Sequence, residues 1–83
     1  MATKLTIDGT ETNMGTDPDL KTCQEAVGGY IEGVTLNPEC GFALMYCNEE
    51  GLLQGLATNP VASVLAMRPI VGDVVLLTAP EVK

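Results

Sequence analysis

The segment Val74-Val75-Leu76-Leu77 is apolar at every position, so a β-strand formed by it presents hydrophobic side chains on both faces of a sheet. Residues 42–47 share this property, because apolar side chains occupy both alternating sets of positions. Strands of this kind need cover on both sides. A chain of 83 residues buries only about 60–65% of its unfolded surface, so this cover has to come from a small core.

A helix is predicted over residues 59–68, shortly before the last of these strands. Asn59 suits the N-cap of a helix, and Pro60 suits the first turn. Pro69 ends the helix, because the residue before a proline is disfavoured in the helical conformation. The face expected to be buried carries three residues at helical spacing: Val61, Val64 and Leu65.

An earlier helix is predicted to start at Asp17 and to end at Gly28. Asp17 suits the N-cap and Pro18 the first turn, and glycine is the usual left-handed residue after a helix. The predicted buried face carries Leu20, Cys23 and Val27.

The remaining segments predict strands and turns. Lys4–Ile7 alternates in polarity and is expected to form a short strand. Residues 10–16 are polar and are predicted as a loop, with an edge strand as the alternative. The other strand segments are residues 30–36, 42–47 and 52–54, which are expected to form a hairpin with a short third strand.

This order of elements predicts a single α+β domain over residues 1–83, with a mostly antiparallel sheet and two helices packed on one face. Two helices on one face leave the other face uncovered. Either the sheet curls around its own core, or a second copy of the chain covers the open face. We expect a homo-oligomer, most simply a two-fold dimer.

The charge balance restricts the partners. Eleven acidic and four basic residues give a net charge of −7, which repels nucleic acid backbones and anionic membranes. The charge favours basic protein partners, cations, or solubility alone. No segment approaches the ~20 apolar residues that cross a bilayer, and no export signal is visible.

The residue types for common catalytic and metal chemistry are missing. The chain has no histidine, and its three cysteines have no zinc-like spacing. An odd number of cysteines without an export signal indicates reduced thiols and a cytoplasmic location. We expect no catalytic activity, no metal and no cofactor.

Three motifs follow one another along the chain. They are Gly28-Gly29-Tyr30-Ile31-Glu32, Asn48-Glu49-Glu50-Gly51-Leu52-Leu53-Gln54-Gly55-Leu56 followed by Asn59, and Ile70-Val71-Gly72-Asp73-Val74-Val75. Together they resemble a family of small proteins that phages, plasmids and bacterial genomes encode and that is grouped as a domain of unknown function. The resemblance covers residues 20–78, and it implies a mobile-element setting, in which small acidic proteins often counter host defences. It supplies no catalytic residues.

Two carboxylates are candidates for ligand binding. Glu32 lies on an otherwise apolar strand face, where a buried acid needs a partner and is a functional candidate. The alternative is that Glu32 lies at a sheet edge or turns outward at Gly33. Glu49, beside Glu50 in a turn, is a candidate cation site or hydrogen-bond acceptor, with a solvated turn as the alternative.

Arg68 and the start of the later helix are candidates for binding an anion. Arg68 can meet an anionic ligand, or it can pair with the helix dipole or with Asp73. The free amides after Asn59 can bind a phosphate. With two motif residues added, the candidate ligand-binding residues are Tyr30, Glu32, Asn48, Glu49, Asn59 and Arg68.

These observations predict a non-catalytic phage-type accessory protein that counters host defence by sequestering a small, nucleotide-like ligand in an oligomer. One alternative is an acidic protein inhibitor of a host protein, or a nucleic-acid mimic, which uses the charge of −7. Another is an enzyme that uses Glu32 as an acid or base.

Overall fold

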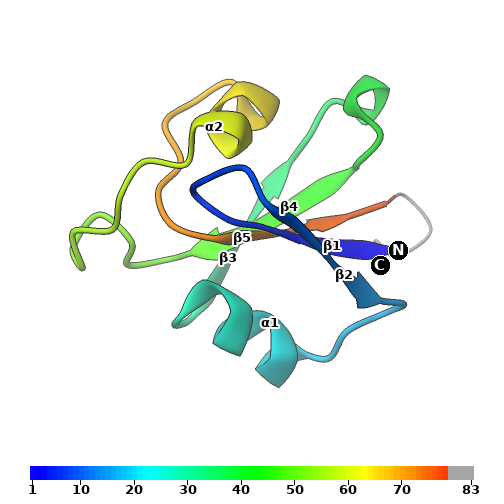
Figure 1. Ribbon diagram of the computed structural model, residues 1–83, viewed down its shortest axis with the longest axis horizontal. Coiled ribbons are helices and arrows are strands. Elements are labelled where there is room, and N and C mark those ends of the chain that lie inside the picture. The colour runs from blue at the N-terminus through cyan, green and yellow to red at the C-terminus, as the bar shows by residue number, and fades with distance from the viewer. Residues whose placement is uncertain (79–83) are drawn as a thin grey trace.

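The computed structural model describes residues 1–78, which form one antiparallel sheet and two α-helices. The strand order is β2-β1-β5-β4-β3, so the C-terminal strand lies at the centre of the sheet (Figure 1). This architecture confirms the predicted α+β class. The elements are β1 (Ala2–Leu5), β2 (Glu11–Gly15), α1 (Leu20–Val27), β3 (Ile31–Thr35), the 3-10 helix η1 (Pro38–Cys40), β4 (Leu44–Asn48), α2 (Pro60–Ala66) and β5 (Val74–Leu77).

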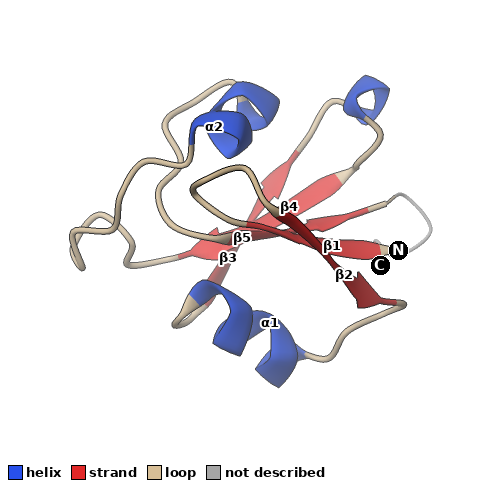
Figure 2. Cartoon of the chain, viewed as in Figure 1, coloured by secondary structure: helices blue, strands red, loops and turns tan. Residues whose placement is uncertain are grey.

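Each face of the sheet is covered by one helix (Figure 2). Val74 of β5 lies in one hydrophobic cluster with Ala62 of α2, whereas Val75 lies in a second cluster with Cys23 of α1. The prediction that both helices share one face is therefore wrong. The reason is that the central strands are apolar on both faces, and each face needs its own cover.

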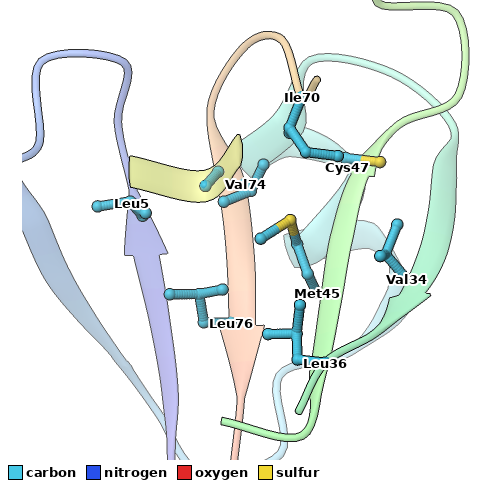
Figure 3. Close-up of a cluster of buried hydrophobic side chains, with 9 residues drawn as sticks. Leu5, Val34, Leu36, Met45, Cys47, Ile70, Val74 and Leu76 are labelled. Carbon is cyan, nitrogen blue, oxygen red and sulfur yellow. The ribbon is translucent and has the colours of Figure 1, made fainter. Parts of the chain in front are cut away.

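The core on the α2 side is shown in Figure 3. It contains Leu5, Val34, Leu36, Met45, Cys47, Ala62, Ile70, Val74 and Leu76. Met45 on this face and Val75 on the other are both 0% exposed in the single chain. The homo-oligomer was expected because one face of the sheet was expected to be uncovered. Within residues 1–78 neither face is left uncovered, so this reason no longer holds. The oligomeric state itself stays a prediction.

The N-terminal segment forms a hairpin of β1 and β2. The prediction of a loop over residues 10–16 is wrong, because β2 pairs antiparallel with β1 along the edge of the sheet. An edge strand needs little apolar surface, and β2 has only the partly buried Met14. The turn contains Gly9 at φ 89°, a conformation that favours glycine.

Helix α1 begins two residues later than predicted. Asp19, not Asp17, is the N-cap, and its carboxylate accepts a hydrogen bond from the Thr22 N–H at 2.8 Å. Gly28 ends the helix at φ 80°, as predicted. Of the predicted buried residues, Leu20 is exposed at the first helical position.

Helix α2 turns a different face inward from the one predicted. Ala62 is buried, and Leu65 and Ala66 pack against the core, whereas Val61 and Val64 are exposed. A small side chain such as that of Ala62 allows a helix to approach the sheet closely. Neither α2 nor any other helix within residues 1–78 is long and apolar enough to cross a bilayer.

Candidate functional site

A groove with a volume of about 580 Å³ lies on the α2 side, where the ends of β3 and β4 meet the segment that leads into β5. Three segments distant in sequence line it. They are Glu32 of β3, the end of β4 with the following loop (Cys47, Asn48, Glu49, Gly51, Leu52 and Leu53), and the connection after α2 (Arg68, Pro69, Ile70 and Val71). Small-molecule sites commonly have volumes of about 300–1,000 Å³ and mainly apolar walls.

Arg68 and Glu32, which both line this groove, form an ion pair. Arg68 Nη2 lies 3.7 Å from Glu32 Oε1, and both side chains are half exposed. The backbone N–H of Arg68 donates to the backbone carbonyl of Ser63 at 3.3 Å, and this bond fixes the chain directly after α2. An ion pair in contact with water contributes only about 0–1 kcal/mol, so an anionic group can displace the carboxylate from the guanidinium.

The loop after β4 is held by Asn48, which is buried. Asn48 Nδ2 donates to the Val27 carbonyl and to Gln54 Oε1, each at 3.1 Å, and Oδ1 accepts from the Glu50 N–H at 2.8 Å. These bonds use both ends of the amide. Asn48 therefore fixes the loop at the groove and leaves little capacity for a ligand.

The same loop supplies the apolar rim of the groove. Leu52 and Leu53 are 82% and 86% exposed, and the predicted strand over residues 52–54 is absent, because the chain forms turns from Glu49 to Gly55. Gly51 is buried below this rim, where an added Cβ would lie 2.7 Å from Val71 Cγ2. The close approach of loop and wall thus requires a glycine at this position.

The structure brings four of the six candidate residues to the groove: Glu32, Asn48, Glu49 and Arg68. Tyr30 does not line it. The Tyr30 side chain is exposed, and its carbonyl accepts from the Glu49 N–H at 2.9 Å.

Asn59 does not line the groove either. It is 0% exposed, and its Oδ1 accepts from the Ala62 N–H at 3.1 Å. Its Nδ2 donates to the carbonyls of Leu5 and Gly72 at 3.2 and 2.9 Å. Asn59 is the N-cap, as predicted, and these bonds use its side chain inside the fold, so the side chain itself is not available to a ligand.

Cys47 also lines the groove, although it is not among the residues predicted to bind a ligand. Burial, and next the charge of Glu32, raise the pKa of this thiol, so it is protonated at neutral pH. Its Sγ lies 3.7 Å from the Glu32 carbonyl oxygen, to which it donates. A protonated thiol is a weak nucleophile. Within residues 1–78, no group of three or more potential ligands is placed to hold a metal ion.

The fold is that of a small α+β domain, with a groove lined by both apolar and charged residues. The chain belongs to the family described as a domain of unknown function (DUF3846), whose model matches residues 4–82. The match confirms the resemblance noted from the three motifs and extends it over the N-terminal hairpin. No curated protein and no solved structure matches the chain.

Proposed function

We propose that this protein is a non-catalytic binding protein that holds a small, nucleotide-like ligand in the groove. The observation that carries the proposal is the half-exposed ion pair of Arg68 and Glu32 beside an apolar wall. A planar guanidinium binds phosphate oxygens in a bidentate geometry. Leu52, Leu53 and Ile70 offer the apolar surface against which the body of such a ligand packs.

The chemistry of the groove favours binding over catalysis. Its thiol is protonated because the pKa of Cys47 is raised, and its Arg68 is paired with Glu32. A nucleophile needs an adjacent base that activates it, and within residues 1–78 no such pair lines the groove.

The setting in the cell is part of the same proposal. Cys23, Cys40 and Cys47 are free thiols, which supports a reducing compartment such as the cytoplasm. The resemblance to proteins of phages and plasmids supports a role against host defence, by sequestration of a nucleotide signal. The expected homo-oligomer now rests on the exposed Leu52 and Leu53, because a second copy would cover this rim.

A thermal-shift screen with cyclic nucleotides and ADP-ribose derivatives tests the ligand. A ligand at 100 times its Kd stabilises the folded state by about 2.7 kcal/mol, which corresponds to about 10–20 °C for a domain of this size. We expect Arg68→Gln to remove the shift. Lys21→Gln removes the same charge from α1, on the opposite face, and should keep the shift. Absence of a shift with every compound contradicts the proposal.

Native mass spectrometry of the protein purified from cells measures the copy number and any retained ligand together. We expect a dimer with a small molecule bound. A dimer that persists after both Leu52→Ser and Leu53→Ser would show that the rim does not hold it.

A second candidate function is an acidic inhibitor of a basic host protein. The observation in its favour is the net charge of −7, with exposed carboxylates at Asp8, Asp19, Glu25 and Glu49. Binding between opposite charges weakens steeply with salt. Salt-insensitive binding to nucleases or DNA-binding proteins would exclude a nucleic-acid mimic.

A further inference from the structure

The outer edge of β3 presents unpaired backbone groups. The Glu49 N–H donates to the Tyr30 carbonyl, and the Leu36 N–H donates to the Ala43 carbonyl, so the even-numbered residues of this segment bond to β4. Hydrogen-bonded and non-bonded positions alternate along an antiparallel pair. Ile31, Gly33 and Thr35 therefore direct their N–H and C=O groups away from the sheet. Within residues 1–78, no strand pairs with this side of β3.

The other edge of the sheet carries a protective feature that β3 lacks. The pairing of β2 with β1 is interrupted by an irregular register between Ala2 and Thr3. Such bulges hinder further strand pairing, as do lysine and proline on an edge strand. The pairing of β3 with β4 runs without a register shift over Ile31–Thr35, and this segment contains neither lysine nor proline. The edge of β3 is thus open to another strand.

Gly33, at the middle of this edge, is not required by the fold of the single chain. Its φ is not in the left-handed region, and a Cβ would meet only Leu44 Cδ1 at 3.6 Å and Tyr46 Cε1 at 3.9 Å, which are ordinary contacts. Glycine within a strand weakens it and often marks a close approach of another backbone. A large side chain from a neighbouring strand can cover an edge glycine and pack on the residues beside it. Gly33 leaves such a space over Leu44 and Tyr46.

We infer that β3 pairs with an extended segment of a basic partner protein, with an aromatic residue opposite Gly33 and a lysine or arginine opposite Glu32. The aromatic side chain would pack on the α1 side of the sheet, and the basic side chain would lie beside the half-exposed Glu32 carboxylate. A second copy of the chain fits less well. A two-fold axis through Gly33 places Glu32 opposite Val34 of the copy, so the carboxylate would face an apolar side chain instead of a basic one. This inference does not depend on the ligand of the groove.

The probe is a short labelled peptide with a phenylalanine-lysine pair flanked by threonines, and its binding is measured by fluorescence anisotropy. Gly33→Pro removes the outward N–H, whereas the matched control Gly33→Ala keeps it and adds only a Cβ, which makes ordinary contacts. We expect Gly33→Pro to weaken binding by about tenfold or more, and Gly33→Ala to bind like the wild-type chain within about twofold. Equal binding by both variants would overturn the proposal.

Two further comparisons test the two side-chain positions. Glu32→Gln should weaken binding of the lysine peptide by about two- to fivefold, which is the range for an exposed ion pair. Gly33→Val fills the space over Leu44 and Tyr46, so it should remove the advantage of phenylalanine over alanine in the peptide. If Glu32→Gln leaves the affinity for the lysine peptide unchanged and Gly33→Val keeps the advantage of phenylalanine over alanine, the assigned register is wrong.

Amide hydrogen exchange on the wild-type protein decides the question even if Gly33→Pro fails to fold. We expect the peptide to slow exchange at Ile31, Gly33 and Thr35, with little change at Glu32 and Val34, which already bond to β4. Protection of the three outward amides that rises with protein concentration without peptide would show self-pairing instead, and would overturn the basic-partner proposal. We expect a ligand in the groove to leave these outward amides unchanged, so failure of this proposal is distinguishable from failure of the first.

Discussion

Asn59 Nδ2 donates a hydrogen bond of 3.2 Å to the carbonyl of Leu5, a residue 54 positions earlier in the chain. The same amide donates to the Gly72 carbonyl, and its oxygen caps α2 by accepting from the Ala62 N–H. One buried side chain therefore connects the end of β1, the start of α2 and the turn before β5. The position of α2 over the sheet depends on this connection.

Replacement of Asn59 should destabilise the whole domain. Asn59→Ala loses the cap and leaves two carbonyl acceptors without their side-chain donor, which predicts a loss of about 3 kcal/mol. Asn59→Asp should also be destabilising, because a carboxylate can cap the helix but cannot donate to Leu5 or Gly72. The control is Asn37→Ala, which removes an exposed cap of η1 and should cost less than about 1 kcal/mol. Urea unfolding measures all three, and equal losses for Asn59 and Asn37 would contradict this account.

Asn59 also shows how far the sequence predicts the site. Local signals correctly identified it as an N-cap, because capping depends on neighbours in the chain. Its contacts with Leu5 and Gly72 depend on how distant segments meet, so a ligand role and a structural role were equally compatible with the sequence. For the same reason, the sequence identified Glu32 and Arg68 individually but not the groove that they share.

The faces of the strands were predictable, whereas the arrangement of the helices was not. Alternation correctly placed Val74 and Val75 on opposite faces, because side chains of a strand alternate. In α2, apolar residues lie on more than one side, so spacing alone could not distinguish Val64, which is exposed, from Ala62, which is buried. The connections of a helix determine which face of the sheet it covers. Local sequence patterns do not indicate the path of these connections, so they do not predict that face.

Met67 offers a stabilising substitution. It ends α2 in the left-handed conformation at φ 56°, which is unfavourable for a residue with a Cβ, and its side chain is 87% exposed. Met67→Gly should therefore raise the free energy of unfolding by about 1 kcal/mol. Met67→Ala is the matched control, because it removes the same exposed side chain and keeps the conformational cost. If chemical denaturation shows the same change for both, relief of backbone strain is not the cause.

The three thiols should react at different rates. Burial, and next the charge of Asp19, raise the pKa of Cys23, and burial followed by the charge of Glu32 raises that of Cys47. Cys40 is only partly buried. At about pH 8, a thiol reagent should modify Cys40 at least tenfold faster than the other two, and urea should make all three reactive. Cys40→Ser should abolish the fast phase, and a fast phase that survives this substitution would contradict the burial of Cys23 or Cys47.

The cap of α1 should make stability depend on pH in acid. Hydrogen bonds from Thr22, first from its side chain and then from its N–H, lower the pKa of Asp19 below the ordinary 3.8. A carboxyl whose pKa is lower in the folded state stabilises that state above its unfolded pKa. This stabilisation is lost as the pH falls through the folded pKa, so the effect should appear below about pH 4.

Asp19→Asn keeps a capping oxygen but does not titrate, so its stability should fall less on acidification than that of the wild-type chain. Glu25→Gln removes one carboxylate from the same helix without touching the cap and is the control for charge alone, and urea unfolding between about pH 2 and pH 7 compares the two variants with the wild-type chain. Parallel curves for Asp19→Asn and the wild-type chain would show that this cap does not contribute to the acid sensitivity.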